Sequence, residues 1–310
     1  MAAARSFADM LAQFLTIYLP VTRDCSPNTV SAYRDAFTLF LRFMDQQQAT
    51  SPDKVSFTDF TEANVAAFIG WLRTDRQCST ATTNQRLAAL KSYFRYVQAQ
   101  APEQIAQAQQ VLGIKAAQAP EPAIGYLPVE AIGLLLEHAT HRGPRDLALL
   151  TTLYDTGARV QEICDLSIRD LHLAKPASAA LTGKGRKTRI VPLTPQAAQI
   201  LTQHVRTLPH DSSGPVFANR AGQRRGRAGV AYILASCMHA AHAERPELVP
   251  EKISPHVLRH SKAMHLLENG VNLIYLRDIL GHASIVTTEV YANPRKFHQT
   301  RDWLVMSVSE

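Results

Sequence analysis

Six side chains that could act on a phosphodiester stand in the second half of the chain. They are Arg159, Lys184, His256, Arg259, His282 and Tyr291. Guanidinium, ammonium and imidazole groups can stabilise the charge that builds on a phosphate under attack, a task that metal ions perform in other enzymes. A tyrosine hydroxyl can attack the phosphorus and hold the strand covalently, so that rejoining needs no ATP. Because no acidic metal cage accompanies the set, it predicts strand transfer without metal or cofactor.

Glycines stand close before Arg159 and Lys184. Gly157 breaks an apolar helix, so that Arg159 can lie at a helix start where backbone amides favour an anion. The alternative is an ion pair with Glu162 on one helix face. Lys184 is expected at the tip of a hairpin whose glycines let the backbone approach a ligand. The alternative there is a solvated turn, and the spacing of a nucleotide-binding loop is absent.

A helix start at Ser254–Pro255 puts His256 and Arg259 on one helix face. An imidazole beside a guanidinium at a helix N-terminus predicts an anion site with one titratable member. By spacing alone, His256, His260 and His265 could also bind zinc. That alternative lacks a neighbouring Glu or Cys ligand, so we predict no metal site.

His282 and Tyr291 stand nine positions apart near the end of the chain. Gly281 is expected to end one helix and Ser284 to cap the next, which leaves His282 in the joint between them. Tyr291 comes just before Pro294 ends that segment. Taken alone, such a tyrosine is more typical of a core aromatic with its hydroxyl at the surface.

Apolar residues at helical spacing predict four helices in the first hundred residues. These are Ser6–Tyr18, one that begins at Ser26–Pro27, one near Thr61 and one after Ser79. They predict a small helical bundle over residues 1–105. The fourth helix carries hydroxyl and amide groups with spaced cations, which suit a helix against DNA; the alternative is a solvated face. The side chains concerned are Thr80, Thr82, Asn84, Arg86 and Lys91.

Residues 106–124 are rich in Ala, Gln and Pro and are predicted to form a linker with a helical first half. Residues 125–310 are predicted to be mostly helical, with a strand–turn–strand hairpin over residues 180–193. The fold class is therefore mainly α, with a small β-hairpin or sheet in the second domain. A basic segment of that domain offers phosphate contacts, or equally a solubilising turn. Its arginines are Arg220, Arg224, Arg225 and Arg227.

The net charge of +7 favours a polyanionic partner. Basic and acidic residues nearly balance through residue 105, and all 12 histidines lie beyond residue 137, so the charge and the histidine chemistry belong to the second domain. The four dispersed cysteines suggest neither disulfides nor a zinc site and fit a reducing cytosol. No apolar run reaches the roughly 18 residues of a membrane span, and no secretory signal opens the chain. We expect a cytoplasmic protein without a membrane partner.

Together these segments resemble the tyrosine recombinase family (phage integrase, Xer-like). The strings TGARVQE, GKGRKTRIVPL, SPHVLRHSKAMHLLENG and LGHASIVTTEVY match its signature in order and spacing, and SPNTVSAYRDAFTLFLRF and STATTNQRLAALKSYFRY resemble its core-binding domain. The resemblance implies a two-domain clamp, a SAM-like helical domain and a catalytic domain around double-stranded DNA. It also implies a homo-tetramer that pairs two recombination sites. The apolar tail Trp303–Met306 would dock on a neighbouring subunit; the alternative is folding back on its own domain.

The same resemblance implies a role for each of the six side chains. Three would bind the scissile phosphate and stabilise the transition state: Arg159, Arg259 and His282. Lys184 would protonate the 5′ leaving oxygen, His256 would assist proton movement at the tyrosine, and Tyr291 would form the 3′-phosphotyrosyl link. Glu162 would support the first arginine.

The host of such an enzyme is expected to be a bacterium, with the protein in the cytoplasm at the nucleoid. Tyr291 is followed by Ala-Asn-Pro rather than the Thr-His typical of chromosome-dimer-resolving Xer enzymes, which favours a mobile element or plasmid. Accessory DNA-bending or directionality factors are expected partners. Two other functions stay open: a type IB-like topoisomerase, and a sequence-specific DNA-binding protein without activity. The helical first domain and the tail argue against the former, and the complete set of six against the latter.

Overall fold

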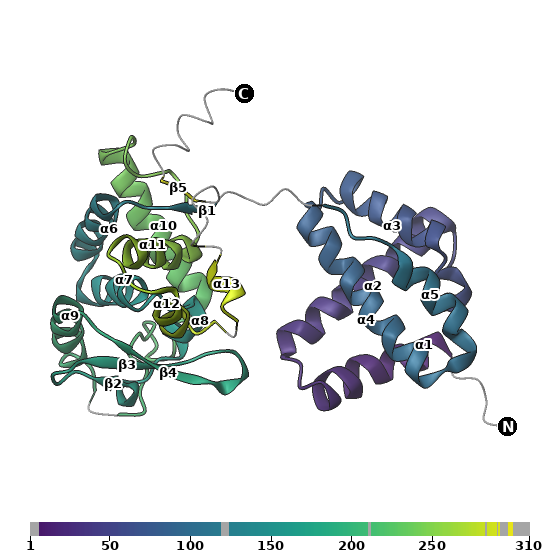
Figure 1. Ribbon diagram of the computed structural model, residues 1–310, viewed down its shortest axis with the longest axis horizontal. Helices are drawn as coiled ribbons and strands as arrows, with labels where there is room; N and C mark the ends of the chain where they lie inside the picture. Colours follow the sequence, from purple (N-terminus) through teal and green to yellow (C-terminus); the bar gives the residue numbers. More distant parts are fainter. Residues whose placement is uncertain are drawn as a thin grey trace. The chain divides into compact units, whose positions relative to one another are not determined.

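The computed structural model describes residues 6–118, 124–209, 212–282, 284–289, 291 and 297–299. It divides into two compact units, Met1–Glu121 and Pro122–Glu310 (Figure 1). Each unit has its own hydrophobic core. The fold class predicted from the sequence, mainly helical with a small sheet in the second unit, is confirmed. Within the described part of the chain, no helix is both long and apolar enough to cross a membrane.

The N-terminal unit is a bundle of helices. They are α1 (Phe7–Gln13), continued by a π-helical segment (Phe14–Thr22), α2 (Pro27–Gln48), α3 (Glu62–Thr74), α4 (Thr80–Gln100) and α5 (Ile105–Gly113), with 3₁₀ turns at Phe57–Asp59 and Pro102–Gln104. The predicted helix starts at Ser26 and Ser79 are confirmed, and both serines cap their helices: their hydroxyls accept hydrogen bonds from the amides of Thr29 and Thr82. Aromatic rings of α2, α3 and α4 fill the core between them.

Helix α5 extends this unit beyond residue 105, into residues 106–124, which we had predicted to be a linker. Ala108 and Val111 are buried in the same core as α4. Farther on, Asn84 of α4 pairs with the backbone of Ala117: its Nδ2 donates to the Ala117 carbonyl at 2.8 Å, and the Ala117 amide donates to its Oδ1 at 3.1 Å. Apolar burial and these two hydrogen bonds hold the chain to the first unit as far as residue 117.

The second unit is mainly helical and carries a small sheet at one edge (Figure 1). The helices are α6 (Val129–Arg142), α7 (Pro144–Thr156), α8 (Val160–Asp165), α9 (Pro195–Val205), α10 (Arg227–Glu244), α11 (Pro255–Glu268), α12 (Leu273–Leu280) and α13 (Val286–Glu289), with 3₁₀ turns at Ile168–Asp170 and Lys184–Arg186. The antiparallel sheet has the order β2 (Leu171–His172), β3 (Ser178–Thr182) and β4 (Thr188–Pro192). The predicted hairpin is β3–β4, with Ala180 opposite Ile190.

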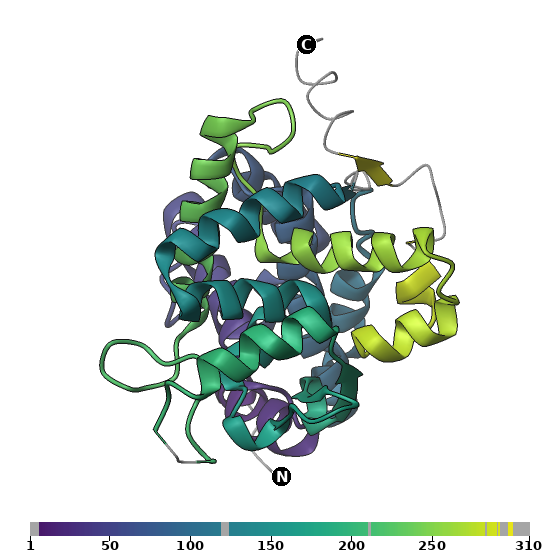
Figure 2. The same ribbon diagram turned by 90° about the vertical axis from the view of Figure 1, so that its left-hand side faces the viewer.

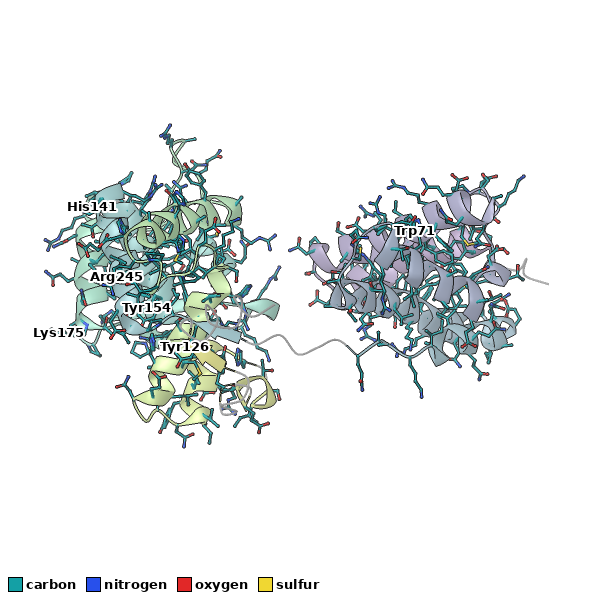
Figure 3. The ribbon with its side chains drawn as sticks, turned by 90° about the horizontal axis from the view of Figure 1, so that it is seen from above. Trp71, Tyr126, His141, Tyr154, Lys175 and Arg245 are labelled. Atoms are coloured by element: carbon teal, nitrogen blue, oxygen red, sulfur yellow. The ribbon has the colours of Figure 1, made fainter. Side chains whose placement is uncertain are left out.

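A separate parallel pair joins the two ends of this unit. Strand β1 (Ile124–Tyr126) pairs with β5 (Phe297–Gln299), which follows the segment of Tyr291. The Tyr126 hydroxyl ties β1 to α11 by donating to Glu268 Oε1 at 2.9 Å. Figure 2 shows α11 lying alongside α12, and Figure 3 labels Tyr126 and Tyr154 in this same part of the unit. Helix α11 thus packs against α7, α12 and β1.

Candidate active site

A pocket of about 310 Å³ in the second unit brings five of the six predicted side chains together. Its lining comprises Arg159, His256, Arg259, His260, His282, Thr287 and Tyr291. The residue before α8 supplies Arg159, helix α11 supplies His256, Arg259 and His260, and the segment from the end of α12 to the residues after α13 supplies the others. Lys184 lies at the tip of the β3–β4 hairpin, where Gly185 adopts φ +72°, but its side chain falls outside the part that the structure describes.

Two glycine turns precede two of the segments that line this pocket. Gly157 ends α7 and Gly281 ends α12, as the sequence predicted, and both adopt the left-handed region, with φ +57° and φ +65°. The turns are followed directly by the segments that carry Arg159 and His282. A side chain at Gly157 would also meet Leu280 Cδ2 at 3.0 Å, so glycine is required there for conformation and for space.

The guanidinium of Arg259 links the two turns through hydrogen bonds. Its Nη1 donates to the carbonyl of Gly157 and its Nη2 to the carbonyl of Leu280, each at 2.7 Å. The side chain is 4% exposed. Burial and then the charge of Arg159 lower the pKa of Arg259 to about 10, which still leaves the guanidinium charged at neutral pH. A buried cation is therefore fixed at the floor of the pocket.

Arg159 is held at the pocket by a buried carboxylate. The Arg159 amide donates to Glu162 Oε2 at 2.8 Å, and its Nη1 donates to Oε1 at 3.1 Å. Arg189 of β4 makes two further bonds to the same carboxylate, both of 2.8 Å, and its Nε donates to the carbonyl of Ile279. The ion pair that we considered as the alternative for Arg159 is thus present, and it leaves Arg159 partly exposed at the pocket.

Glu162 consequently has a larger structural role than the support expected of it. Burial alone would raise its pKa, but the hydrogen bonds and charges of Arg189 and Arg159 lower that pKa overall. Arg189 was not singled out in the sequence. No local pattern predicts that a strand residue 27 positions away reaches this carboxylate.

We expect Glu162→Gln to destabilise the second unit by about 3 kcal/mol, because it removes one partner of a buried ion network. Since the pKa of Glu162 is lowered in the fold, its contribution is present above the ordinary value of 4.5 and is lost as the pH falls below it. Thermal unfolding from pH 7 down to pH 3 measures this, and the wild-type and variant midpoints should converge at the acid end. Glu137→Gln, an exposed change on α6, is the control. Equal stability of Glu162→Gln and wild type at pH 7 would contradict the expectation.

The Tyr291 hydroxyl lies inside the pocket, and its side chain is 5% exposed. Its Oη is 2.8 Å from His260 Nδ1. Burial raises the pKa of Tyr291, while the charges of Arg259 and Arg159 act in the opposite direction. From the sequence, we considered His260 only as a zinc ligand. Its position directly after Arg259 was the one signal that could have indicated a place in this pocket.

His282 lies parallel to the Tyr291 ring, with 6.3 Å between the ring centroids. Its Nδ1 is 3.0 Å from the Thr288 hydroxyl. Burial, followed by the charges of Arg259 and Arg159, lowers the pKa of His282 to about 4. The imidazole is therefore neutral at pH 7 and can donate one hydrogen bond.

The three histidines of α11 have different surroundings. His256 is exposed at the first turn and lines the pocket. His260 contacts Tyr291, whereas His265 is buried with Nδ1 at 2.8 Å from the Tyr154 hydroxyl. Rings directed at two separate tyrosines do not suit a shared metal ion. Among the described residues, no group of three or more His, Cys, Asp or Glu could hold one.

The side chains of α4 that we predicted to face DNA fall into two groups. Asn84 is bonded to Ala117, and Arg86 Nη1 donates to the carbonyl of Ala32 on α2 at 3.0 Å, so both hold the first unit together. The others are partly exposed: Thr80, Thr82 and Lys91. Intramolecular partners leave Asn84 and Arg86 fewer donors for DNA than the sequence suggested.

The basic segment before α10 divides in a similar way. Arg224 Nη2 donates to the Ser167 hydroxyl at 2.8 Å, and Arg225 is half-buried. Arg220 in the loop and Arg227 at the first residue of α10 are exposed. The latter two have the exposure that a phosphate contact requires.

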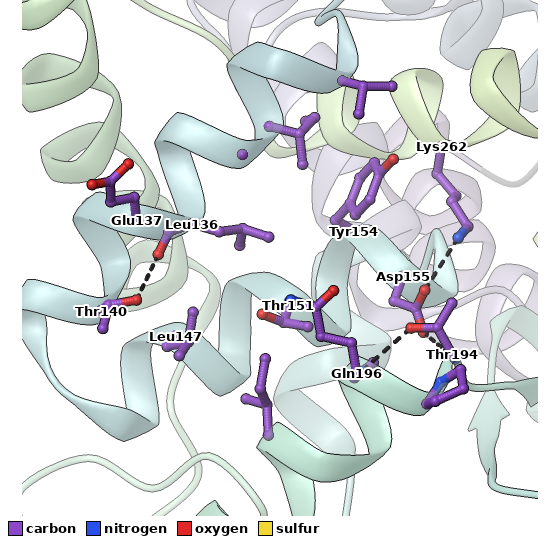
Figure 4. A pocket seen from close by; sticks show the side chains of 16 residues that line it. Leu136, Glu137, Thr140, Leu147, Thr151, Tyr154, Asp155, Thr194, Gln196 and Lys262 are labelled. Atoms are coloured by element: carbon purple, nitrogen blue, oxygen red, sulfur yellow. Dashed lines mark hydrogen bonds and ion pairs between the residues drawn. The ribbon is translucent and has the colours of Figure 1, made fainter.

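A larger pocket of about 890 Å³ lies between α6, α7 and α9, with Lys262 of α11 at one side (Figure 4). Lys262 Nζ is 3.2 Å from Asp155 Oδ1, and the Thr194 amide donates to Asp155 Oδ2 at 2.9 Å. This ion pair ties α7 to α11 and to the start of α9. None of the six predicted side chains is among its lining residues, and we assign it no catalytic role.

Comparison with known proteins gives matches over nearly the whole chain. The sequence model of the phage integrase family matches residues 126–298, and that of the phage integrase N-terminal SAM-like domain matches residues 11–101. A putative integrase/recombinase, y4rC of Sinorhizobium fredii, is 32% identical and covers 92% of this chain and 87% of its own length. The tyrosine recombinase XerC of Herpetosiphon aurantiacus is 34% identical, covering 91% of this chain and 90% of its own.

Solved structures share the fold at lower identity. The site-specific recombinase XerH, bound to its difH substrate before cleavage, matches with a TM-score of 0.68 at 22% identity, over 97% of this chain and 85% of that one. The Tn1549 transposon integrase, in complex with transposon right end DNA, matches with a TM-score of 0.71 at 15% identity, over 96% and 99%. At these identities the likeness concerns the fold.

Proposed function

Because the chain belongs to the phage integrase family of tyrosine recombinases, we propose that Tyr291 is the nucleophile with which it cleaves and rejoins DNA. The protein is a site-specific recombinase. The observation that carries the assignment of Tyr291 is the position of its hydroxyl, which lies in a pocket lined by two arginines and three histidines. Attack on a DNA phosphate would leave a 3′-phosphotyrosyl link and a free 5′ end.

The phosphate would be bound by Arg159, Arg259 and His282. Arg259 supplies a buried charge that two backbone carbonyls fix in place, so little reorganisation accompanies the reaction. Arg159 is oriented by Glu162 and presents its partly exposed guanidinium. A neutral His282 carries its hydrogen on Nε2 when its Nδ1 accepts from the Thr288 hydroxyl, and in that tautomer it can donate to a phosphoryl oxygen. These side chains would stabilise the charge that a metal ion stabilises in other enzymes. We therefore expect cleavage to proceed in the presence of the metal chelator EDTA.

Lys184 would act on the leaving group. Lys184→Ala should slow cleavage roughly 10²-fold or more, because the 5′ oxygen then leaves without a general acid. A substrate with a bridging 5′ sulfur needs no such acid, and on it the variant should approach the wild-type rate. Single-turnover cleavage of the two matched substrates measures the effect. Equal slowing on oxygen and sulfur would remove Lys184 from this role.

The function can be tested before the target sequence has been identified. Wild-type protein is incubated with nicked duplexes whose sequence around the nick is randomised, and covalent complexes are recovered under denaturing conditions. We expect a defined sequence to be enriched. A plasmid with two copies of that sequence should then undergo deletion or inversion. Supercoil relaxation without strand exchange would instead indicate a type IB-like topoisomerase, and binding without covalent capture an inactive DNA-binding protein.

The partner would be double-stranded DNA, which both units would contact. Four protomers and accessory factors would assemble on it. Arg220 and Arg227 are exposed cations of the second unit, and Thr80, Thr82 and Lys91 are their counterparts on α4. Phosphate contacts of this kind position a duplex without reading its sequence. The tail Trp303–Met306 that would link neighbouring subunits lies outside the described residues. A mobile element or plasmid remains our proposal for the host DNA.

A further inference from the structure

The side chain of His260 is in direct contact with the hydroxyl of Tyr291. It lies one helical turn after His256 on α11, is half-buried, and lines the same pocket as both arginines. Its Nδ1 is 2.8 Å from Tyr291 Oη, and the two ring centroids are 5.6 Å apart. His256, by contrast, is exposed at the first turn of the helix.

The protonation states allow the phenol to be the donor of this hydrogen bond. Burial, followed by the charges of His256 and Arg259, lowers the pKa of His260 to about 4, so the ring is neutral at pH 7. Burial raises the pKa of Tyr291, so the phenol keeps its proton. In the tautomer with its hydrogen on Nε2, Nδ1 of His260 accepts from the Tyr291 hydroxyl. The proposal below uses this tautomer.

We propose that His260 is a catalytic residue of strand cleavage, which orients the Tyr291 hydroxyl and accepts its proton as the oxygen attacks phosphorus. This proposal rests on the proposed role of Tyr291. In the step, the hydroxyl proton moves to His260 Nδ1, the bond from Oη to phosphorus forms, and the bond from phosphorus to the 5′ oxygen breaks. The 5′ oxygen takes a proton from a donor on its own side. In rejoining, the 5′ hydroxyl attacks phosphorus and gives its proton back to the group on its own side. The bond from phosphorus to Oη breaks, and His260 returns its proton to the departing phenol oxygen.

The same geometry explains why the tyrosine would stay unreactive without DNA. An imidazole of such low basicity cannot deprotonate a buried phenol in the empty pocket. A phosphodiester between Arg159 and Arg259 brings a negative charge next to the ring and favours its protonated form. Proton transfer would therefore accompany formation of the bond to phosphorus rather than precede it.

The test uses the DNA sequence recovered by covalent capture, in nicked suicide duplexes with a 5′ oxygen or a 5′ sulfur leaving group. His260→Asn retains a hydrogen-bond acceptor near the position of Nδ1 but has no basic nitrogen. We expect it to cleave about 100-fold more slowly on both substrates, since the defect concerns the nucleophile. Lys184→Ala, with its defect relieved by sulfur, is the contrasting control. His265→Asn removes the matching contact to Tyr154 and should cleave at the wild-type rate per folded molecule.

His260→Ala provides a second readout. Added imidazole should restore part of its cleavage rate, because the small base can occupy the space of the missing ring, whereas it should not accelerate His260→Asn. A wild-type rate for His260→Asn would overturn the proposal, and so would a defect that sulfur relieves, since the residue would then act on the leaving group. Either result would leave Tyr291 as the nucleophile. Covalent capture by Tyr291→Phe would instead reject the proposed function itself.

Discussion

Tyr291→Phe is expected to abolish covalent capture of DNA, lowering it at least about 10⁴-fold, while the affinity for DNA changes less than about threefold. The substitution removes one oxygen, and no other hydroxyl in this part of the described chain has the same contacts with His260 and the two arginines. The cations that we propose to bind phosphate remain. Nicked suicide duplexes, resolved on a denaturing gel, measure the covalent product, and a filter or mobility assay measures binding.

A matched control exists within the same unit. The Tyr154 hydroxyl also lies 2.8 Å from a histidine Nδ1, that of His265, and burial raises the pKa of Tyr154 to about 12. Tyr154→Phe therefore loses the same kind of hydrogen bond, at a cost of roughly 1 kcal/mol, without touching the pocket. We expect Tyr154→Phe to capture DNA normally. Loss of capture in both variants would mean that a general loss of folding, and not the missing nucleophile, explains the result.

The sequence predicted those parts of the site that follow local rules. Gly157 and Gly281 were expected at helix ends, and both adopt the left-handed conformation that only glycine reaches without strain. The helices that follow Ser26 and Ser79 begin where expected, and β3 and β4 form the predicted hairpin. In each case a short pattern and its immediate neighbours decide the structure.

The parts that sequence reasoning missed depend on residues far apart in the chain. Strands β1 and β5 have three residues each and are too short to show an alternating pattern. The bond between Arg189 and Glu162 spans 27 positions, and that between Arg86 and Ala32 spans 54. His260 was interpreted as an alternative metal ligand because the sequence could not show which way each face of α11 points. Tertiary packing decides these contacts, and it also turned Asn84 toward Ala117.

Arg259→Lys tests whether the floor of the pocket depends on the shape of this cation as well as on its charge. The guanidinium donates simultaneously to the carbonyls of Gly157 and Leu280, which belong to the two turns before Arg159 and His282. A lysine keeps the positive charge, but its single ammonium lacks the planar fork that reaches two carbonyls at fixed angles. One buried carbonyl would lose its partner, at a cost of about 1–3 kcal/mol.

The cleavage rate of Arg259→Lys should fall further than expected from the loss of one phosphate contact. Removing a single donor to the developing charge typically costs roughly 10²–10³-fold, and freeing the two turns would also displace the neighbouring phosphate ligands. We therefore expect single-turnover cleavage by Arg259→Lys to drop about 10³-fold or more, with a lower melting temperature. Arg245→Lys, an exposed change at the end of α10, should alter neither quantity. Near-normal cleavage by Arg259→Lys would show that charge alone suffices. If Arg259→Lys lost stability but kept full activity per folded molecule, the role of Arg259 would be only to link α7 and α12. The phosphate would then be bound by Arg159 and His282.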